Sequence, residues 1–237
     1  RCMNFGLNRN EPMRDVKQKA GIKHNQEVQG LLDNKIQETT KVFEDLPIIH
    51  TGCGTYASIY PEFKHFNLLK EVDEVVEHLV SLLPEGKWTC DNGQDIHLIM
   101  TGGEPLLAWQ RLYIELFEHP RMQDLKNVTF ETNSTQLLHD NFRDYLNNHD
   151  RITWTFSCSP KLSVSGEPWD TAIKPNVVAD YNDIQNSDLY LKFVVADRTD
   201  IDEAGRAVDE YRSAGVDCPV YLMPLGGRSE EYNLNVQ

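Results

Sequence analysis

An apolar run near position 100 ends in two glycines, a carboxylate and a proline. Ile96–Met100 suits a buried strand, and Gly102 and Gly103 let its end turn sharply, so a ligand could approach bare backbone beside Glu104. Pro105 fixes φ for the first turn of a helix expected from Leu106. Because α/β folds build sites at the carboxyl ends of strands, this stretch predicts a ligand site there. A strand-to-helix turn without a ligand is the alternative.

Polar residues also lie at the ends of later strand-like segments, expected at Val128–Thr132, Arg151–Ser157 and Val220–Met223. In a parallel sheet these ends gather at one rim. The rim would then hold side chains from several strands, namely Thr101, Glu104, Glu131, Asn133, Ser157, Ser159, Lys161, Met223, Pro224 and Gly226.

Lys192 lies within an apolar strand expected at Leu189–Ala196. A lysine there is costly unless its amine reaches water or a partner. A functional role and a side chain that merely reaches solvent both stay open.

Helical and strand-like segments alternate along most of the chain. Apolar residues from Val72 to Leu83 recur at helical spacing, with Glu71, Asp73, Glu74 and Glu77 facing away. Further helices are expected at Leu106–Glu118, Gln136–Leu146, Asp170–Tyr181 and Asp202–Ala214, the last stopped by Gly215. The alternation predicts an α/β fold with a parallel sheet and crossover helices.

Length and composition set further bounds. The 237 residues, 40% of them hydrophobic, are enough for one sizeable core and few for two domains. A net charge of -14 argues against direct nucleic-acid binding. No apolar run approaches a membrane span and no signal-peptide pattern is present, so no membrane association and a cytoplasmic location are expected. P-loop, G-x-S-x-G and zinc-type cysteine motifs are absent.

Five widely spread cysteines, Cys2, Cys53, Cys90, Cys158 and Cys218, favour reduced thiols over disulfides and leave some free for a metal. Residues 1–50 fit the α/β pattern least well and are expected to form an N-terminal excursion or insertion, followed by the domain at 51–237. Because the chain starts at Arg1, we expect a segment of a longer protein.

Five blocks resemble radical S-adenosylmethionine (SAM) enzymes and, among them, the 7-carboxy-7-deazaguanine synthases, most strongly the virus-encoded ones. They are, in the family's order, TGGEPLL at 101–107, FETNST at 130–135, SCSPK at 157–161, LKFVV at 191–195 and YLMPLGG at 221–227. The similarity covers roughly residues 51–227. It implies an incomplete β/α barrel of about six parallel strands, with a [4Fe-4S] cluster and SAM at its carboxyl-end rim.

The resemblance also implies roles for individual residues. Glu104 and Lys161 would be catalytic, and Thr101 and Lys192 would contact substrate. SAM would be held by Gly102, Gly103, Glu104, Glu131, Asn133, Ser157, Ser159, Lys161, Met223, Pro224 and Gly226.

The metal ligands implied by the resemblance lie toward the N-terminus. Cys2 and Cys53 would bind the cluster, with the first cysteine ligand upstream of this sequence, and Thr55 would help bind Mg²⁺. Gly54 stands where the family has aspartate, and the usual C-x3-C-x2-C spacing is interrupted by the long insertion.

By the same resemblance the chain is a lyase. It would convert 6-carboxy-5,6,7,8-tetrahydropterin to 7-carboxy-7-deazaguanine by radical ring contraction with loss of ammonia, for queuosine-type modification of tRNA or DNA. A flavodoxin-like electron donor would reduce the cluster, and the relatives' homodimer stays open for this chain. Another radical SAM enzyme, a non-catalytic domain that binds pterin or SAM, and an acidic α/β domain without chemistry remain as alternatives.

Overall fold

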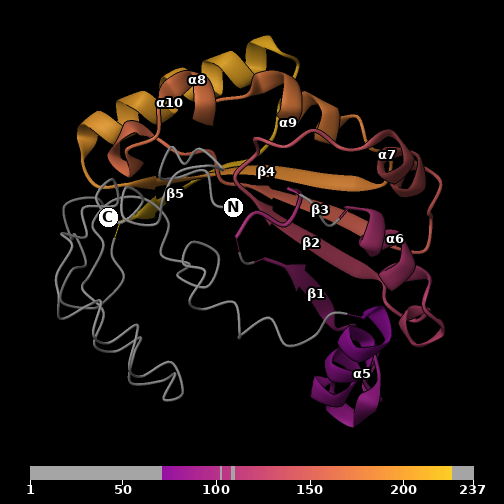
Figure 1. The fold of residues 1–237 in the computed structure, drawn as a ribbon. Coiled ribbons are helices and arrows are strands. Elements are labelled where there is room, and N and C mark those ends of the chain that lie inside the picture. Colours follow the sequence, from indigo (N-terminus) through magenta and orange to yellow (C-terminus); the bar gives the residue numbers. More distant parts are fainter. Residues whose placement is uncertain (1–70, 102, 108–109, 226–237) are drawn as a thin grey trace, which may run out of the picture.

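The computed structural model describes residues 71–101, 103–107 and 110–225. Five strands form one sheet in chain order, and every neighbouring pair is parallel (Figure 1). The strands are β1 (His97–Met100), β2 (Asn127–Thr132), β3 (Thr153–Cys158), β4 (Ser187–Val195) and β5 (Val220–Pro224). The expected α/β class and parallel sheet are confirmed, with five strands in this part of the chain where about six were expected.

One face of the sheet carries the core. Val128, Phe130, Trp154 and Phe156 are fully buried on it. Aromatic side chains of the helices pack there: Phe117 lies 5.2 Å from Trp154, Phe142 lies 5.9 Å from Phe130, and Tyr181 stacks on Phe156 at 4.8 Å between ring centroids. This row of aromatic contacts fixes the helices on one side of the sheet.

The helices are α5 (Val72–Leu82), α6 (Gln110–Glu118), α7 (Asp140–Asn147), α8 (Trp169–Ala172), α9 (Pro175–Asn182) and α10 (Arg198–Ser213). Short 3₁₀ turns occupy Pro84–Gly86, Pro120–Met122 and Ser163–Ser165. Figure 1 shows α8, α9 and α10 lined along the sheet beside β4. The strand order never reverses, so right-handed crossovers place the connecting helices on the same face.

The opposite face has a different character. Side chains alternate along a strand, so Glu131, Thr155, Ser157 and Lys192 point away from the aromatic core. These residues are polar, whereas their neighbours on the core side are aromatic or aliphatic. Exposed apolar side chains flank them on the outer strands, Ile99 in β1 and Tyr221 and Met223 in β5, so a ligand site on this face would be polar at its centre and apolar at its edges.

Three expected helix starts are wrong. The last helix, expected from Asp202, begins at Arg198, because the Asp197 side chain caps it there by accepting from Thr199 N and Asp200 N. The chain after Pro105 first makes a turn, with Leu107 N donating to Glu104 O, and α6 runs from Gln110. Residues 136–139 are not helical, and α7 starts at Asp140. The expected helix at 170–181 is two helices, because Pro175 begins α9 after a break.

Other local expectations are confirmed. The acidic residues of α5 are exposed, and Gly215 ends α10 at φ 89° with its N–H on Arg212 O. Among the described helices, none is long and apolar enough to cross a membrane. The expected excursion at 1–50 lies outside the described residues.

Candidate ligand-binding rim

Glu104 joins the chain after β1 to the chain after β2. Its Oε1 accepts hydrogen bonds from Leu106 N at 3.1 Å and Thr132 Oγ1 at 2.7 Å, and its Oε2 accepts one from Asn133 N at 2.7 Å. The side chain is only 5% exposed. A carboxylate has about four acceptor positions, so these three bonds leave one on Oε2.

The charge state of Glu104 reflects opposing influences. Burial raises its pKa, while the hydrogen bonds from Asn133, Thr132 and Leu106 and the positive charge of Lys161 favour the ionised form. A buried carboxylate and an ammonium group thus share the carboxyl-end rim.

Asn133 contributes its backbone to this contact and its side chain to another. Its Oδ1 accepts from Thr135 N at 3.1 Å and Thr135 Oγ1 at 2.7 Å, which closes a tight turn after β2. Ser134 at the centre of the turn has φ 65° and is fully buried. The Asn133 side chain thus stabilises the turn, and its backbone N–H binds Glu104.

Lys161 follows β3 on a loop that is tied to β2. Ser159 N donates to Thr132 O at 2.8 Å, so the loop starts beside the Glu104 contact. Lys161 Nζ donates to Ser159 Oγ at 3.3 Å. The structure thereby brings Glu104, Ser159 and Lys161 to one place, as the sequence predicted.

Glu131 and Lys192 meet across β3 on the face opposite the aromatic core. Lys192 Nζ lies 3.3 Å from Glu131 Oε1, with the lysine side chain 19% and the glutamate side chain 40% exposed. Ser157 is in register with Glu131 on one side and Tyr190 on the other. Its Oγ is buried and meets no hydrogen-bond partner among the described residues. The lysine inside an apolar strand therefore has an acidic partner, which supplies what such a residue needs.

The end of β5 carries exposed apolar side chains at the same rim. Met223 pairs with Val194 in the sheet and is 43% exposed, and Leu225 N donates to Val195 O at 2.8 Å. Tyr221 meets Tyr190 edge to face, with ring centroids 5.4 Å apart. Pro224 closes the strand. This part of the rim offers apolar surface and backbone.

Some predicted site residues are not joined to this cluster. Thr101 is exposed at the end of β1, and Gly103 adopts φ 54°, which suits its glycine. Gly102, Gly226, Cys2, Cys53 and Thr55 lie outside the described residues.

The cysteines that the structure describes do not form a metal site. Burial raises the pKa of the Cys158 thiol to about 12, which disfavours the thiolate that binds metals. Cys90 and Cys218 are half-buried free thiols. Within residues 71–101, 103–107 and 110–225, no group of three potential metal ligands gathers. Cys2 and Cys53, the predicted ligands of the iron–sulfur cluster, lie outside the described residues.

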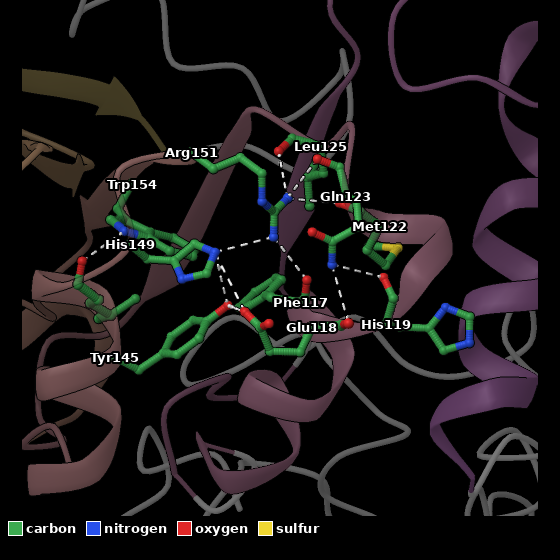
Figure 2. A network of polar contacts seen from close by, with 11 residues as sticks. Phe117, Glu118, His119, Met122, Gln123, Leu125, Tyr145, His149, Arg151 and Trp154 are labelled. Carbon is green, nitrogen blue, oxygen red and sulfur yellow. Dashed lines mark hydrogen bonds and ion pairs between the residues drawn. The ribbon is translucent and has the colours of Figure 1, made fainter.

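A second polar network lies at the opposite end of the sheet (Figure 2). Arg151, just before β3, donates to the carbonyls of Phe117, Met122, Gln123 and Leu125 at 2.8–3.1 Å. It also contacts His149 Nε2 at 3.2 Å. Arg151 thus binds the carbonyls at the end of α6 and in the turn that follows, a structural task that leaves little for a ligand.

Three buried polar residues that hold the rim were missed by sequence reasoning. Thr132 bridges Glu104 and Ser134 N, Gln110 binds both Leu106 O and His139 N, and Glu203 binds Ser163. A signal existed for Glu203, because it lies one position before Ala204 and three after Asp200, on the inward stripe of its helix.

Comparisons with models of known protein families, with curated proteins and with solved structures find no match.

Proposed function

We propose that the chain is a radical SAM enzyme that converts 6-carboxytetrahydropterin to 7-carboxy-7-deazaguanine. The observation that carries this proposal is the buried Glu104 carboxylate at the same carboxyl-end rim of a parallel sheet as Lys161, since Thr132 binds both Glu104 and the Ser159 N–H at the start of the lysine loop. A carboxylate and an ammonium group at one rim complement an α-amino acid zwitterion, which is the polar end of SAM. The five motif blocks supply the family and the reaction.

Glu104 and Lys161 fit the methionyl part of SAM. Glu104 Oε2 has an acceptor position left after its bond to Asn133 N, which suits an amino group. The Lys161 ammonium, oriented by Ser159, suits the carboxylate. The exposed Met223 and the backbone around it suit a flat, partly apolar ring such as adenine.

The Glu131–Lys192 pair supports a second ligand beside the first. It offers a carboxylate acceptor and an ammonium donor, and the Ser157 hydroxyl, without a partner in the part of the chain that the structure describes, faces the same side of the sheet. A polar heterocycle with alternating donors and acceptors would use all three groups. When bound, the cluster and SAM would supply radical chemistry, and Glu104, Lys161, Glu131 and Lys192 would hold SAM and the substrate in place.

A partial β/α barrel is the architecture we propose for the whole domain. The support is the unreversed strand order, since doubly wound sheets reverse their order and place helices on both faces. A singly wound sheet leaves one face for a ligand or for closure.

The deciding experiment uses the full-length protein, reconstituted without oxygen with iron and sulfide, reduced, and supplied with SAM, Mg²⁺ and 6-carboxytetrahydropterin. Mass spectrometry should detect 7-carboxy-7-deazaguanine. SAM cleavage without this product would overturn the substrate and favour another radical SAM reaction. A protein that assembles no cluster would overturn the enzyme and favour a binding domain.

A titration with SAM tests the rim itself. Lys161→Met should weaken SAM binding roughly tenfold, which corresponds to about 1.4 kcal/mol. Lys126→Met is the matched control, because Lys126 pairs with Asp95 just before β2, at the other end of the sheet. Equal affinities for both variants would contradict the role of Lys161.

A further inference from the structure

Two buried carboxylates on α10 face the rim. Asp200 and Glu203 lie one helical turn apart and are each 6% exposed. Asp200 Oδ2 accepts from Ala196 N at 2.7 Å and so fixes the turn after β4. Glu203 reaches in the other direction, to the loop after β3 that carries Lys161.

In the part of the chain that the structure describes, the Glu203 side chain makes its hydrogen bonds to one residue. Its carboxylate accepts from Ser163 N at 3.1 and 3.2 Å and from Ser163 Oγ at 2.6 Å. Burying a carboxylate is unfavourable, and an apolar contact would hold a loop to a helix equally firmly. The carboxylate also constrains orientation, because its hydrogen bonds fix both the backbone N–H and the side chain of Ser163.

Lys161 lies between two fixed points of this loop. On one side Ser159 N is bound to Thr132 O of β2. On the other side Leu162 is buried at 2% exposure and Ser163 is bound to Glu203. The backbone that carries the lysine is therefore held from both ends, by the sheet and by α10.

We propose that Glu203 is a positioning residue for the SAM site: by binding Ser163 it holds the 159–163 loop so that the Lys161 ammonium stays at the rim that carries Glu104. This inference rests on the proposed function for the role of Lys161 in SAM binding. The position of the loop itself can be tested without SAM.

Trypsin provides that independent measurement, because it cleaves after Lys161. In the full-length protein, Glu203→Ala should raise the rate of cleavage between Lys161 and Leu162 at least tenfold, read by mass spectrometry of the fragments. Glu203→Gln keeps an acceptor for Ser163 N and should restore most of the protection. Asp209→Ala, an exposed acid on the same helix, is the control and should cleave as the unaltered protein does.

SAM titration by calorimetry completes the test. Glu203→Ala should weaken SAM binding three- to tenfold, with partial recovery in Glu203→Gln. Ser163→Ala, which removes only the hydroxyl contact, gives a milder variant if Glu203→Ala fails to fold, and should show smaller changes in the same directions. A cleavage rate in Glu203→Ala and Ser163→Ala equal to that of the unaltered protein would overturn the inference. If the unaltered protein binds no SAM, the proposed function and the SAM role of Glu203 both fall, while cleavage still decides whether Glu203 holds the loop.

Discussion

Glu104 and Asn133 connect the ends of two neighbouring strands through a 2.7 Å hydrogen bond from the Asn133 backbone N–H to the buried Glu104 carboxylate. The same carboxylate accepts from Thr132 and Leu106. A residue proposed to bind a cofactor thus also shapes the rim. Changes at Glu104 should therefore affect stability as well as SAM binding.

Glu104→Ala should lower the free energy of unfolding by about 2–4 kcal/mol, because it leaves buried donors without an acceptor. Urea unfolding followed by circular dichroism measures the effect. Glu115→Ala, at an exposed position on α6, is the control and should change stability by less than about 0.5 kcal/mol. If the two variants were equally stable, Glu104 would have no structural role.

The strands could be read from the sequence because each is a short segment whose core-side residues are apolar, as Val128 and Phe130 are in β2, and β2 at Asn127–Thr132 differs by one residue from the expected 128–132. The start of α7 could not be predicted from the sequence in this way. His139 N binds Gln110 Oε1 at 2.7 Å and Leu138 N lies 3.4 Å from Asp180 Oδ2, so partners distant in sequence hold this backbone outside the helix. Local pattern carries no information on such partners.

At the rim, too, some features could be predicted from the sequence and others depend on the tertiary fold. Residue types at strand ends predicted that Glu104, Ser159 and Lys161 would gather, because parallel strands bring their ends together. The pairing of Lys192 with Glu131, 61 positions away, and the hold of Glu203 on Ser163, 40 positions away, depend on the tertiary fold. Pattern reasoning left Lys192 undecided for that reason.

His149 should make stability depend on pH. Burial and the neighbouring Arg151 charge lower its pKa, while Glu118 and Asp150 act in the opposite direction. The unfolded chain then takes up a proton more readily than the folded protein. The contribution of His149 is present above its ordinary pKa of 6.5 and is lost as the pH falls below it.

His149→Gln should reduce the loss of stability between about pH 7.5 and pH 5, since the amide does not titrate in this range and can accept from Arg151. Unfolding free energies at both pH values give the comparison. His78→Gln, at an exposed site on α5, provides the control. A His149→Gln protein with the same pH dependence as the unaltered one would contradict the assignment.

Arg151→Lys should destabilise the protein by about 2–3 kcal/mol although the charge is kept. The guanidinium donates to four backbone carbonyls in the network of Figure 2, and one ammonium group cannot reach all of them. Thermal unfolding of this variant beside Arg111→Lys, at an exposed position on α6, isolates the effect. If Arg151→Lys and Arg111→Lys had equal melting temperatures, the several N–H donors of the Arg151 guanidinium would not be needed for stability.

Ser134→Gly should stabilise the protein. Ser134 has φ 65°, a backbone conformation that favours glycine, and its buried Oγ meets no nitrogen or oxygen partner in the described part of the chain. Glycine relieves the strain and removes the unsatisfied hydroxyl, and these gains outweigh its larger entropy in the unfolded chain. We expect the free energy of unfolding, measured with urea, to rise by about 0.5–1 kcal/mol.

Asn186→Gly is the matched comparison, since Asn186 has φ 56° but its Nδ2 donates to Ile152 O at 2.8 Å. That variant loses a hydrogen bond as it gains freedom, so it should be no more stable than the unaltered protein. A stabilisation of Asn186→Gly equal to that of Ser134→Gly would assign the whole effect to the backbone and none to the unpartnered hydroxyl.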